Sequence, residues 1–423
     1  MGLISKKVSE GKLLSSSQAI EVVTKAMPEV DFCNSKVLLI VPDATRTAPV
    51  GELFKAIHNQ IGSVTSALDV MIALGTHQAM SETAIEERLE ISHNERITQY
   101  SKVQFLNHAW DDPSELKNIG TISAKEISDL SGGLFEMDVP VEINANLFNY
   151  DHIVIIGPVF PHEVVGFSGG NKYLFPGVAG PQVLNFFHWL GAVITTPKII
   201  GHKWTPVRKV IDRAGAMLKI PKIAFCMVVE NDGMCGLFAG PVEEAWAAAS
   251  DLSAERHIII KDKPYHTIVA CAPEMYDEIW TAGKCMYKLE PVLADGGELI
   301  IYAPHISEVC ITHGKTIDKA GYHCRDYFLK QWNQFKDMPW GALAHCVHVK
   351  GLGKFENGVE TPRATVTLAT QISESKCEQI NLGYRDPKTI NPQDYANREH
   401  EGTLLVPHAG ERLFRLANPP AWA

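Results

Sequence analysis

Short apolar runs alternate with helical periodicity along the first part of the chain. The runs Lys36–Val41 and Ala67–Ala73 are rich in large apolar residues and predict buried strands. Between them, from Pro49 to about Ile61, apolar residues recur at helical spacing, and another helix is expected to begin near Ser81, a good N-cap residue. This repeated order of strand, loop and helix predicts a sheet of mostly parallel strands.

The same alternation continues through the rest of the chain. A polar, less regular region precedes a strand at Asp151–Gly157, and a helix follows at about Pro181–Leu190, with proline at its first position. Further strands are predicted at Lys222–Val229, His266–Pro273, Glu298–Ala303 and Thr403–Gly410, and further helices at Ser17–Met27, Pro241–Ser250 and Tyr276–Leu293. The fold class is therefore α/β.

A length of 423 residues favours two domains, because single hydrophobic cores stop growing at about 250–300 residues. A polar, charged stretch near Asp262 is the expected boundary. We expect an N-terminal α/β domain at 1–262, a C-terminal α/β domain at 263–400, and a segment at 401–423 for which a return to the first domain is one option. Ligands of open α/β sheets bind beyond the carboxyl ends of the strands, so the active site is expected there, in the interdomain cleft.

Composition excludes several classes of function. A net charge of -10 argues against nucleic acid as a partner, and no apolar run of about 18 residues predicts a membrane span. The N-terminus carries no secretory signal pattern. Nine scattered cysteines without a C-x-x-C pair indicate reduced thiols, and therefore a cytoplasmic protein.

Polar residues that can carry chemistry follow three of the predicted strands. Asp43 and Arg46 follow the first strand, His77 the second and His162 a later one. Histidine is the usual general acid or base near neutral pH, and Arg46 can bind a carboxylate or phosphate with two hydrogen bonds. The alternatives are a simple turn with a capping aspartate, and histidines that are structural or solvated.

The segment Gly166–Lys172 (GFSGGNK) joins a glycine-rich turn to a lysine. Glycine amides and the hydroxyl of Ser168 can cradle a phosphate, although the segment is not a G-x-x-x-x-G-K-[ST] loop and a plain tight turn explains it equally well. A partly desolvated Lys172 would be a nucleophile able to form a covalent link. Otherwise it is a surface lysine.

Two further residues are single candidates. His188 lies in an apolar helix, where the alternatives are a core histidine and the one protein ligand of a metal that a cofactor otherwise coordinates. Lys284, in the second domain, either completes an anion site or is a solvated helix lysine.

These segments together resemble the nickel-dependent lactate racemase family, which includes related 2-hydroxyacid racemases and epimerases. The resemblance is carried by DATR at 43–46, GTH at 75–77, PHEVVGFSGGNKYLFPG at 161–177, and His188. His162, Lys172 and His188 keep the spacing typical of the family. The resemblance covers most of the N-terminal domain and, more loosely, the second.

The resemblance implies a nickel pincer nucleotide, a pyridinium mononucleotide with two thio-acyl arms. Lys172 would carry it through a thioamide, and His188 would be the protein ligand of the nickel. His77 and His162 would be the catalytic pair, and Lys284 would hold the substrate carboxylate. The positions that would line the pocket for cofactor and substrate are Asp43, Thr45, Arg46, Ser168, Gly169 and Gly170.

The implied reaction is racemisation or epimerisation of a 2-hydroxyacid by reversible hydride transfer. Loss of the Cα hydrogen as a proton would leave a carbanion beside a carboxylate, whereas transfer as hydride avoids that charge. The expected partners are the small-molecule substrate and, transiently, cofactor-synthesis proteins.

Departures from the family pattern leave the substrate open. Thr47 stands where the family usually has proline, and Thr281, beside Trp280, stands where lactate racemases have glutamine. Because Trp280 and Thr281 should line the substrate end, malate, an aromatic hydroxyacid or a sugar acid is as good a candidate as lactate. Two other readings remain: a family member that binds nickel or the nucleotide without racemase activity, and an NAD-dependent dehydrogenase, which lacks the expected G-x-G-x-x-G.

Overall fold

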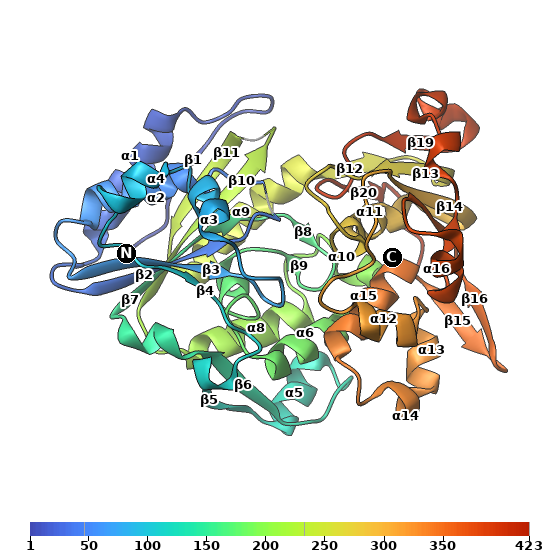
Figure 1. The fold of residues 1–423 in the computed structure, drawn as a ribbon, viewed down its shortest axis with the longest axis horizontal. Coiled ribbons are helices and arrows are strands. Elements are labelled where there is room, and N and C mark those ends of the chain that lie inside the picture. The colour runs from blue at the N-terminus through green and yellow to red at the C-terminus, as the bar shows by residue number, and fades with distance from the viewer. Residues whose placement is uncertain (46, 232, 423) are drawn as a thin grey trace. The chain divides into compact units, whose positions relative to one another are not determined.

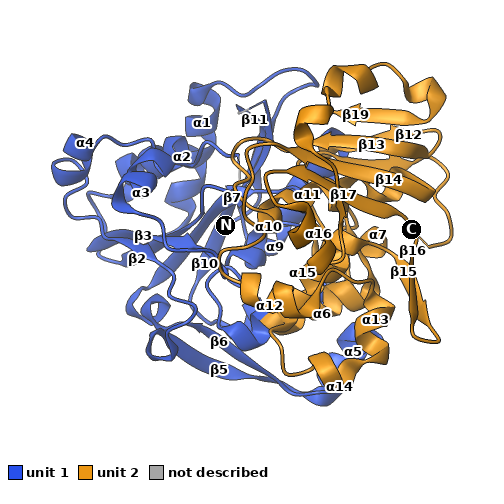
Figure 2. Cartoon of the chain, turned by 45° about the vertical axis from the view of Figure 1, so that its right-hand side comes forward, with its two compact units in different colours: residues 1–160, 167–184, 206–256 blue, residues 161–166, 185–205, 257–423 orange. Residues whose placement is uncertain are grey.

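The computed structural model describes residues 1–45, 47–231 and 233–422. The chain divides into two compact units, coloured separately in Figure 2. Unit 1 comprises residues 1–160, 167–184 and 206–256, and unit 2 comprises residues 161–166, 185–205 and 257–423. The two short inserts of unit 2, at 161–166 and 185–205, carry His162 and His188. The contiguous N-terminal domain expected at 1–262 therefore differs from unit 1, which lacks 161–166 and 185–205 and ends at residue 256.

Unit 1 is built on a seven-stranded sheet in the order β1-β11-β10-β7-β2-β3-β4, as far as the described residues show (Figure 1). The strands from β10 to β4 run parallel to one another, whereas β11 pairs antiparallel with both β1 and β10. The bounds are β1 (Ile4–Lys7), β2 (Lys36–Pro42), β3 (Ala67–Ala73), β4 (Phe105–Asn107), β7 (His152–Pro158), β10 (Lys222–Glu230) and β11 (Gly233–Gly240). The predicted strands of this unit are confirmed.

Helices and one antiparallel pair of strands complete unit 1. The helix α2 (Val50–Ile61) buries Leu53, Ile57 and Ile61 in the sheet core, as its apolar spacing predicts. The remaining elements are α1 (Ser16–Ala26), α3 (Glu82–Arg88), α4 (His93–Ile97), α5 (Ala124–Ser131), α8 (Pro206–Met217), α9 (Val242–His257), and the antiparallel pair β5 (Leu116–Ile122) and β6 (Val139–Asn144). The helix α6 (Pro181–Ile194) begins in unit 1 and continues in unit 2.

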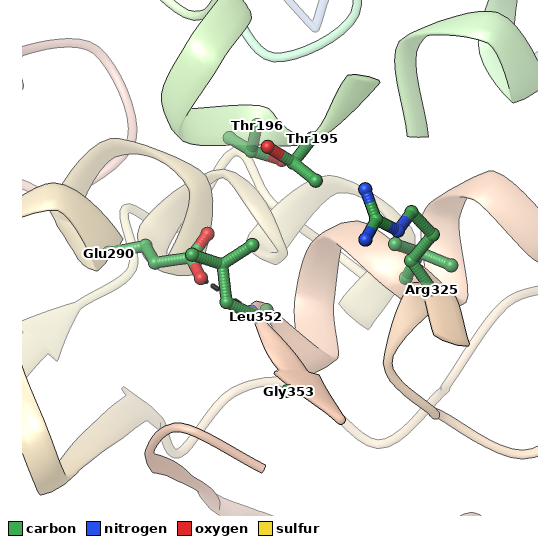
Figure 3. A pocket seen from close by; sticks show the side chains of 8 residues that line it. Thr195, Thr196, Glu290, Arg325, Leu352 and Gly353 are labelled. Carbon is green, nitrogen blue, oxygen red and sulfur yellow. Dashed lines mark hydrogen bonds between the residues drawn. The ribbon is translucent and has the colours of Figure 1, made fainter. Parts of the chain in front are cut away.

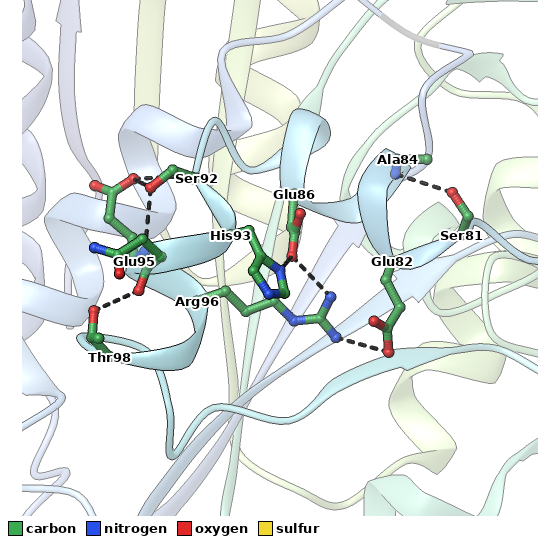
Figure 4. Close-up of polar contacts among 10 residues, drawn as sticks. Ser81, Glu82, Ala84, Glu86, Ser92, His93, Glu95, Arg96 and Thr98 are labelled. Atoms are coloured by element: carbon green, nitrogen blue, oxygen red, sulfur yellow. Dashed lines mark hydrogen bonds and ion pairs between the residues drawn. The ribbon is translucent and has the colours of Figure 1, made fainter.

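The two short helices after β3 are fixed by their caps and by ion pairs (Figure 4). The hydroxyl of Ser81 accepts from Ala84 N at 3.2 Å, which confirms the predicted N-cap of α3. Ser92 and Glu95 form a capping box at α4. Arg96 of α4 then pairs with Glu86 of α3 at 3.2 Å, so the two helices are tied together.

Unit 2 contains a five-stranded parallel sheet in the order β18-β17-β14-β13-β19. The bounds are β13 (Tyr265–Cys271), β14 (Leu293–Ala303), β17 (Thr365–Thr370), β18 (Gly383–Tyr384) and β19 (Thr403–Val406), with the smaller pairs β12 (Ile258–Lys261) with β20 (Leu413–Leu416) and β15 (Gly353–Glu356) with β16 (Val359–Pro362). Its helices are α7 (Thr196–Ile199), α10 (Ile279–Ala282), α11 (Lys284–Leu289), α12 (Gly314–Ala320), α13 (Arg325–Lys330), α14 (Trp332–Phe335), α15 (Trp340–Lys350) and α16 (Glu374–Gln379). The α/β class with mostly parallel sheets is thus confirmed.

Two expected features differ from the structure. The single helix expected at Tyr276–Leu293 is broken into α10, α11 and a 3₁₀ turn, because Gly283 and Pro291 interrupt the helical pattern, and β14 already begins at Leu293. The tail strand β19, for which a return to the first domain was one option, pairs with β13 of the second sheet.

No described helix combines the length and the apolar character needed to cross a bilayer.

Candidate functional site

An aspartate–histidine pair lies at the carboxyl edge of the sheet in unit 1. Parallel pairing places Pro42 of β2 level with Ala73 of β3, so the loops that follow these strands emerge side by side. Asp43 Oδ2 lies 2.5 Å from His77 Nδ1. Asp43 is 6 % exposed, whereas the side chain of His77 is 34 % exposed. The pair therefore has a buried carboxylate and an accessible imidazole.

The environment keeps Asp43 ionised. Burial would raise its pKa, but the charge and hydrogen bond of His77 and the two bonds from Thr45 outweigh burial and lower the pKa of Asp43 well below its usual range. Thr45 donates to Asp43 Oδ1 from its amide at 3.1 Å and from its hydroxyl at 2.7 Å. An ionised Asp43 accepts a hydrogen bond from the N–H at His77 Nδ1, and in the neutral ring this places the lone pair on Nε2. The neutral tautomer that the contact favours is the one in which Nε2 can act as a base.

Lys172 lies on a 3₁₀ turn, Gly170–Tyr173, directly after the glycine-rich segment. The residue is half-buried, which fits the partly desolvated lysine of the first reading and leaves the alternative of a surface lysine open. Positive φ angles at Gly169 (87°) and Gly170 (59°) favour glycine. A Cβ at Gly170 would lie 2.9 Å from Trp246 Cβ, so these positions also lack room for a side chain.

The contacts of this turn do not support the expected phosphate cradle. The hydroxyl of Ser168 accepts from Phe160 N at 2.9 Å and donates to Pro158 O at 3.2 Å. The amide of Ser168 donates to Phe160 O at 2.8 Å, and the amide of Gly170 bonds the buried thiol of Cys226. These groups are engaged inside unit 1, so the contacts favour the alternative of a tight turn, here one that carries Lys172.

The segment after Lys172 is bonded to the loop that carries His77. The amide of Gly75 donates to Gly177 O at 2.9 Å. Two residues farther on, Ala179 O accepts from His108 Nε2 at 3.0 Å, and the amide nitrogen of Asn144 donates to His108 Nδ1 at 3.1 Å. Burial lowers the pKa of His108 to about 4, so the ring is neutral near pH 7. Unit 1 therefore brings Asp43, His77 and the Lys172 segment to one edge of its sheet.

Within unit 2, His162 has a different set of partners. The ring is 4 % exposed, and its Nδ1 accepts from Val164 N at 3.1 Å. In that neutral form the proton is on Nε2. The carboxylate of Glu163 also lies 3.3 Å from Nδ1, where it would stabilise the charged ring. Nδ1 of His162 thus faces both an amide that bonds the neutral ring and a carboxylate that would pair with an imidazolium.

His188 belongs to a group of imidazoles in unit 2. The pKa of His345 lies well below its ordinary value because of burial and then the charges of His348, His313 and His188. Asn185 Oδ1 accepts from Gly341 N at 2.8 Å, which joins α6 to α15. Both ring nitrogens of His345 are occupied, by the hydroxyls of Tyr287 and Tyr322. A protein-only metal centre is not formed, because the described residues contain no suitable group of three or more His, Cys, Asp or Glu.

The expected substrate residues lie near the first helices of unit 2. Lys284 begins α11 and is only 8 % exposed, with its ammonium 4.5 Å from the centre of the Tyr276 ring. It is therefore not the solvated helix lysine of the alternative reading. The indole of Trp280 packs 4.3 Å from the His345 ring, and the hydroxyl of Thr281 donates to Glu278 O at 2.9 Å. Arg46, the other expected anion-binding residue, lies outside the described residues.

Several residues around these side chains escaped the sequence analysis. Arg88 donates to Pro42 O at 3.1 Å and so holds the loop that begins with Asp43. Arg208 and Trp246 contact the glycine-rich turn from α8 and α9, and neither helix carries a recognisable motif. His345 and His348 did carry a signal, since a spacing of three residues places both on one face of α15.

Unit 2 also contains a small pocket (Figure 3). Glu290, fully buried, accepts from Leu352 N at 2.7 Å through Oε1, while its Oε2 has no partner among the described residues. Burial raises the pKa of Glu290. Thr195 has the positive φ of 93° and a hydroxyl that is likewise unpartnered in the described part of the chain. None of the residues expected from the sequence lines this pocket, which contains Thr195, Thr196, Glu290, Arg325, Val347, Gly351, Leu352 and Gly353.

Comparison with known proteins relates the chain to one group. Residues 6–199 match the family model of the lactate racemase N-terminal domain. A lactate racemase from Thermoanaerobacterium thermosaccharolyticum is 22% identical over 307 residues, which span 71% of this chain and 67% of that protein. A lactate racemase from Lactiplantibacillus plantarum is 23% identical over 306 residues, spanning 70% of this chain and 66% of that protein. The alignments thus cover about two thirds of each relative.

Two solved structures extend the likeness over nearly the whole chain. A crystal structure of a Thermotoga maritima protein has a TM-score of 0.89 and 34% identity, covering 97% of this chain and 100% of that one. The lactate racemase apoprotein from Thermoanaerobacterium thermosaccharolyticum has a TM-score of 0.70 at 16% identity, covering 98% of this chain and 100% of that one. At that identity, the second comparison supports the fold alone.

Proposed function

The chain belongs to the lactate racemase family, and on that premise we propose that it is a nickel-dependent racemase or epimerase of a 2-hydroxyacid. The observation that carries the proposal is that each of the two expected catalytic histidines has a carboxylate at Nδ1. Asp43 lies 2.5 Å from His77, and Glu163 lies 3.3 Å from His162. Racemisation needs two groups that exchange protons with a hydroxyl, one for each configuration.

The family resemblance supplies the expected cofactor, a nickel pincer nucleotide. Lys172 fits attachment, since its half-buried amine stands on a fixed turn, and His188 on α6 fits a single protein ligand. One imidazole does not close a metal site, so the remaining donors would come from the cofactor. When bound, this group would supply the acceptor for the Cα hydride.

The side chains of the protein would then handle protons and the carboxylate. The Nε2 lone pair of His77 takes the hydroxyl proton from one configuration of the substrate, and Asp43 stabilises the imidazolium that forms. For the other configuration His162 is the second group that exchanges a proton: with Nδ1 bonded by Val164 N its Nε2 carries a proton to give, and with a proton on Nδ1 directed at Glu163 its Nε2 can take one. Lys284, buried in unit 2, binds the substrate carboxylate by a charge-assisted hydrogen bond.

The substrate class remains a 2-hydroxyacid, and Trp280 and Thr281 argue against assuming lactate. Thr281 is 4 % exposed, and its hydroxyl already bonds Glu278 O, so it offers less polar reach than a glutamine would. Trp280 adds an indole beside His345. Malate, aromatic hydroxyacids and sugar acids are therefore tested together with lactate.

The decisive experiment uses protein produced together with the cofactor-synthesis enzymes. Intact-mass and peptide mass spectrometry should find an added mass on Lys172, and metal analysis should find about one nickel per chain. Chiral chromatography should then show interconversion of the two configurations of at least one acid in the panel. Lys172→Arg, which keeps the charge but cannot form the thioamide, is the matched control and should lose the added mass and the activity. An unmodified Lys172 in the wild-type protein under these conditions would refute the proposal.

The second candidate is a family member that binds nickel or the nucleotide without turnover. The extensive internal bonding of His345 and Thr281 favours it, because these side chains are committed to the fold rather than open for substrate. Stoichiometric nickel with no interconversion across a broad chiral panel would select this candidate. Formation of free NADH with net oxidation of substrate would instead support a dehydrogenase.

A further inference from the structure

Arg208 on α8 and Trp246 on α9 both contact the backbone of the glycine-rich turn. Arg208 is 0 % exposed and Trp246 1 %, and the guanidinium carbon lies 3.9 Å from the centre of the indole ring. A completely buried arginine is uncommon, because desolvating its charge is costly unless hydrogen bonds and other charges compensate. Burial indeed lowers the pKa of Arg208 to about 10, against the opposing charge of Asp212. The desolvation of the Arg208 guanidinium must therefore be compensated by contacts within the fold.

Arg208 and Trp246 donate hydrogen bonds to backbone carbonyls of the glycine-rich turn. Arg208 Nη2 donates to Phe167 O at 2.5 Å, and both Nη atoms lie 3.4 Å from Gly169 O. Between these carbonyls, Ser168 O accepts from the indole N–H of Trp246 at 2.9 Å. The carbonyls of three consecutive residues are therefore bound by two side chains.

The same hydrogen-bonded turn includes the backbone of Lys172. Gly169 O also accepts from Lys172 N at 3.3 Å, so the carbonyl that Arg208 binds is the one that starts the lysine-bearing turn. The side-chain nitrogen of Asn171, Nδ2, donates to Asp212 at 3.1 Å and to Glu243 at 2.8 Å. These two carboxylates lie on the same two helices, α8 and α9. Every one of these contacts lies within unit 1.

We infer that Arg208 and Trp246 are positioning residues that hold the 167–173 turn, and so present the Lys172 amine in one orientation for covalent attachment of the cofactor. The inference rests on the proposed function for the identity of the attached group. The fixed geometry of the 167–173 turn, in contrast, is a property of the chain without the cofactor. The glycines at 169 and 170 are part of it, because side chains there would strike Val159 and Trp246. The turn therefore acts as a support for an amine rather than as a binder of phosphate.

The test starts with protein that has never met the cofactor. Trp246→Phe keeps the ring and its contact with Arg208 but removes the bond to Ser168 O, and Arg208→Lys keeps the charge but not the fork. Loss of one hydrogen bond of about 1 kcal/mol should speed amide exchange in residues 168–175 by about fivefold. The extent of Lys172 acylation is then measured by peptide mass spectrometry across a pH series. In the two variants its pH profile should shift relative to wild type, while the profiles of the other lysines stay unchanged.

Arg213→Lys is the matched control, since Arg213 lies on the same helix but pairs with Glu126. It should leave both readouts as in wild type. A merely structural role for Trp246 would lower Tm without changing the pH profile of Lys172, and that outcome overturns the inference, as would unchanged exchange in Trp246→Phe. In cells that make the cofactor, the modified fraction of Lys172 should fall severalfold in both Trp246→Phe and Arg208→Lys. If the wild-type chain carries no cofactor at all, the proposed function fails. Altered amide exchange and altered Lys172 acylation in the variants would still support the role of Arg208 and Trp246 in holding the turn.

Discussion

The surroundings of His77 in unit 1 and His162 in unit 2 differ, although both rings face a carboxylate. Asp43 is buried, held by Thr45, and lies 2.5 Å from His77 Nδ1, so the proton of that ring has one place. Glu163 lies farther from His162, at 3.3 Å, and competes with the amide of Val164 for the same nitrogen. Nδ1 of the first ring therefore has a single close carboxylate partner, whereas Nδ1 of the second faces both an amide and a carboxylate.

This difference shows how one fold can give two histidines unequal roles. A short bond to a buried carboxylate fixes the tautomer, while a shared nitrogen leaves the choice to the protonation state. Because an enzyme cannot change the equilibrium between two configurations, kcat/KM must fall equally in both directions when either histidine is impaired. The half-reactions, measured as 2-keto acid formed from each configuration in a single turnover, separate the two.

Asp43→Asn should have the largest effect. The asparagine amide would donate to His77 Nδ1 and place the ring proton on Nε2, so the base would be lost. By analogy with other histidine bases left in the wrong tautomer, kcat should fall by about 10³- to 10⁴-fold. Quenched single turnovers should show the loss in the half-reaction of one configuration.

The control for this change is Thr45→Val, which removes the 2.7 Å bond to Asp43 but leaves the carboxylate in place. Its effect should be at least tenfold smaller than that of Asp43→Asn. Equal losses in the two variants would contradict the role given to the tautomer of His77.

Glu163→Gln should have a smaller effect, because Val164 N still orients the ring of His162. Loss of a charge-assisted bond worth about 1.5 kcal/mol should lower kcat by about tenfold. The loss should fall on the opposite half-reaction to that affected by Asp43→Asn. If both variants slowed the same half-reaction, the division of labour between the two units would be wrong.

His108→Gln should change stability rather than chemistry, and so tests how firmly the unit 1 site is held. The folded pKa of His108, about 4, is below the value of about 6.5 expected in the unfolded chain. Its contribution is therefore fully present above about pH 6.5 and is lost as the pH falls toward about 4. At pH 5 the two pKa values correspond to a loss of about 2 kcal/mol in the free energy of unfolding.

Glutamine can keep the bonds to Ala179 O and Asn144 without taking up a proton. The fall in Tm between pH 7 and pH 5 should thus be smaller in His108→Gln than in wild type, by about 4 °C. Scanning calorimetry at the two pH values measures this difference. An identical fall in the two proteins would show that His108 does not couple the Lys172 segment to pH.

The sheets could be predicted from the sequence because buried parallel strands leave continuous apolar runs. β2 and β3 begin at the expected residues, Lys36 and Ala67, and α2 buries the predicted face. The antiparallel strand β11 and the helix α15 were missed, since glycines interrupt the first and the second is buried on most sides, without a polar face. Breaks such as Gly283 were also underestimated, because local propensity does not show which glycine will end a helix.

The candidate site was anticipated at the level of residue types and strand ends. Asp43 and His77 were expected at one sheet edge, and the structure brings them into contact. Arg208, Trp246 and Glu163 were not expected. Arg208 and Trp246 act over long sequence separations, through backbone carbonyls that have no signature in a sequence.

The sequence by itself determined the α/β class, the family and the position of Lys172 after a glycine-rich turn, because these depend on periodicity and on motifs of neighbouring residues. Only the tertiary structure decided how the turn is bonded. Its amides and the hydroxyl of Ser168 bond inside unit 1, and its carbonyls are held by side chains about 40 and 80 residues away. Packing determines which hydrogen-bonding groups are already satisfied and which remain for a ligand, and no local pattern contains that information.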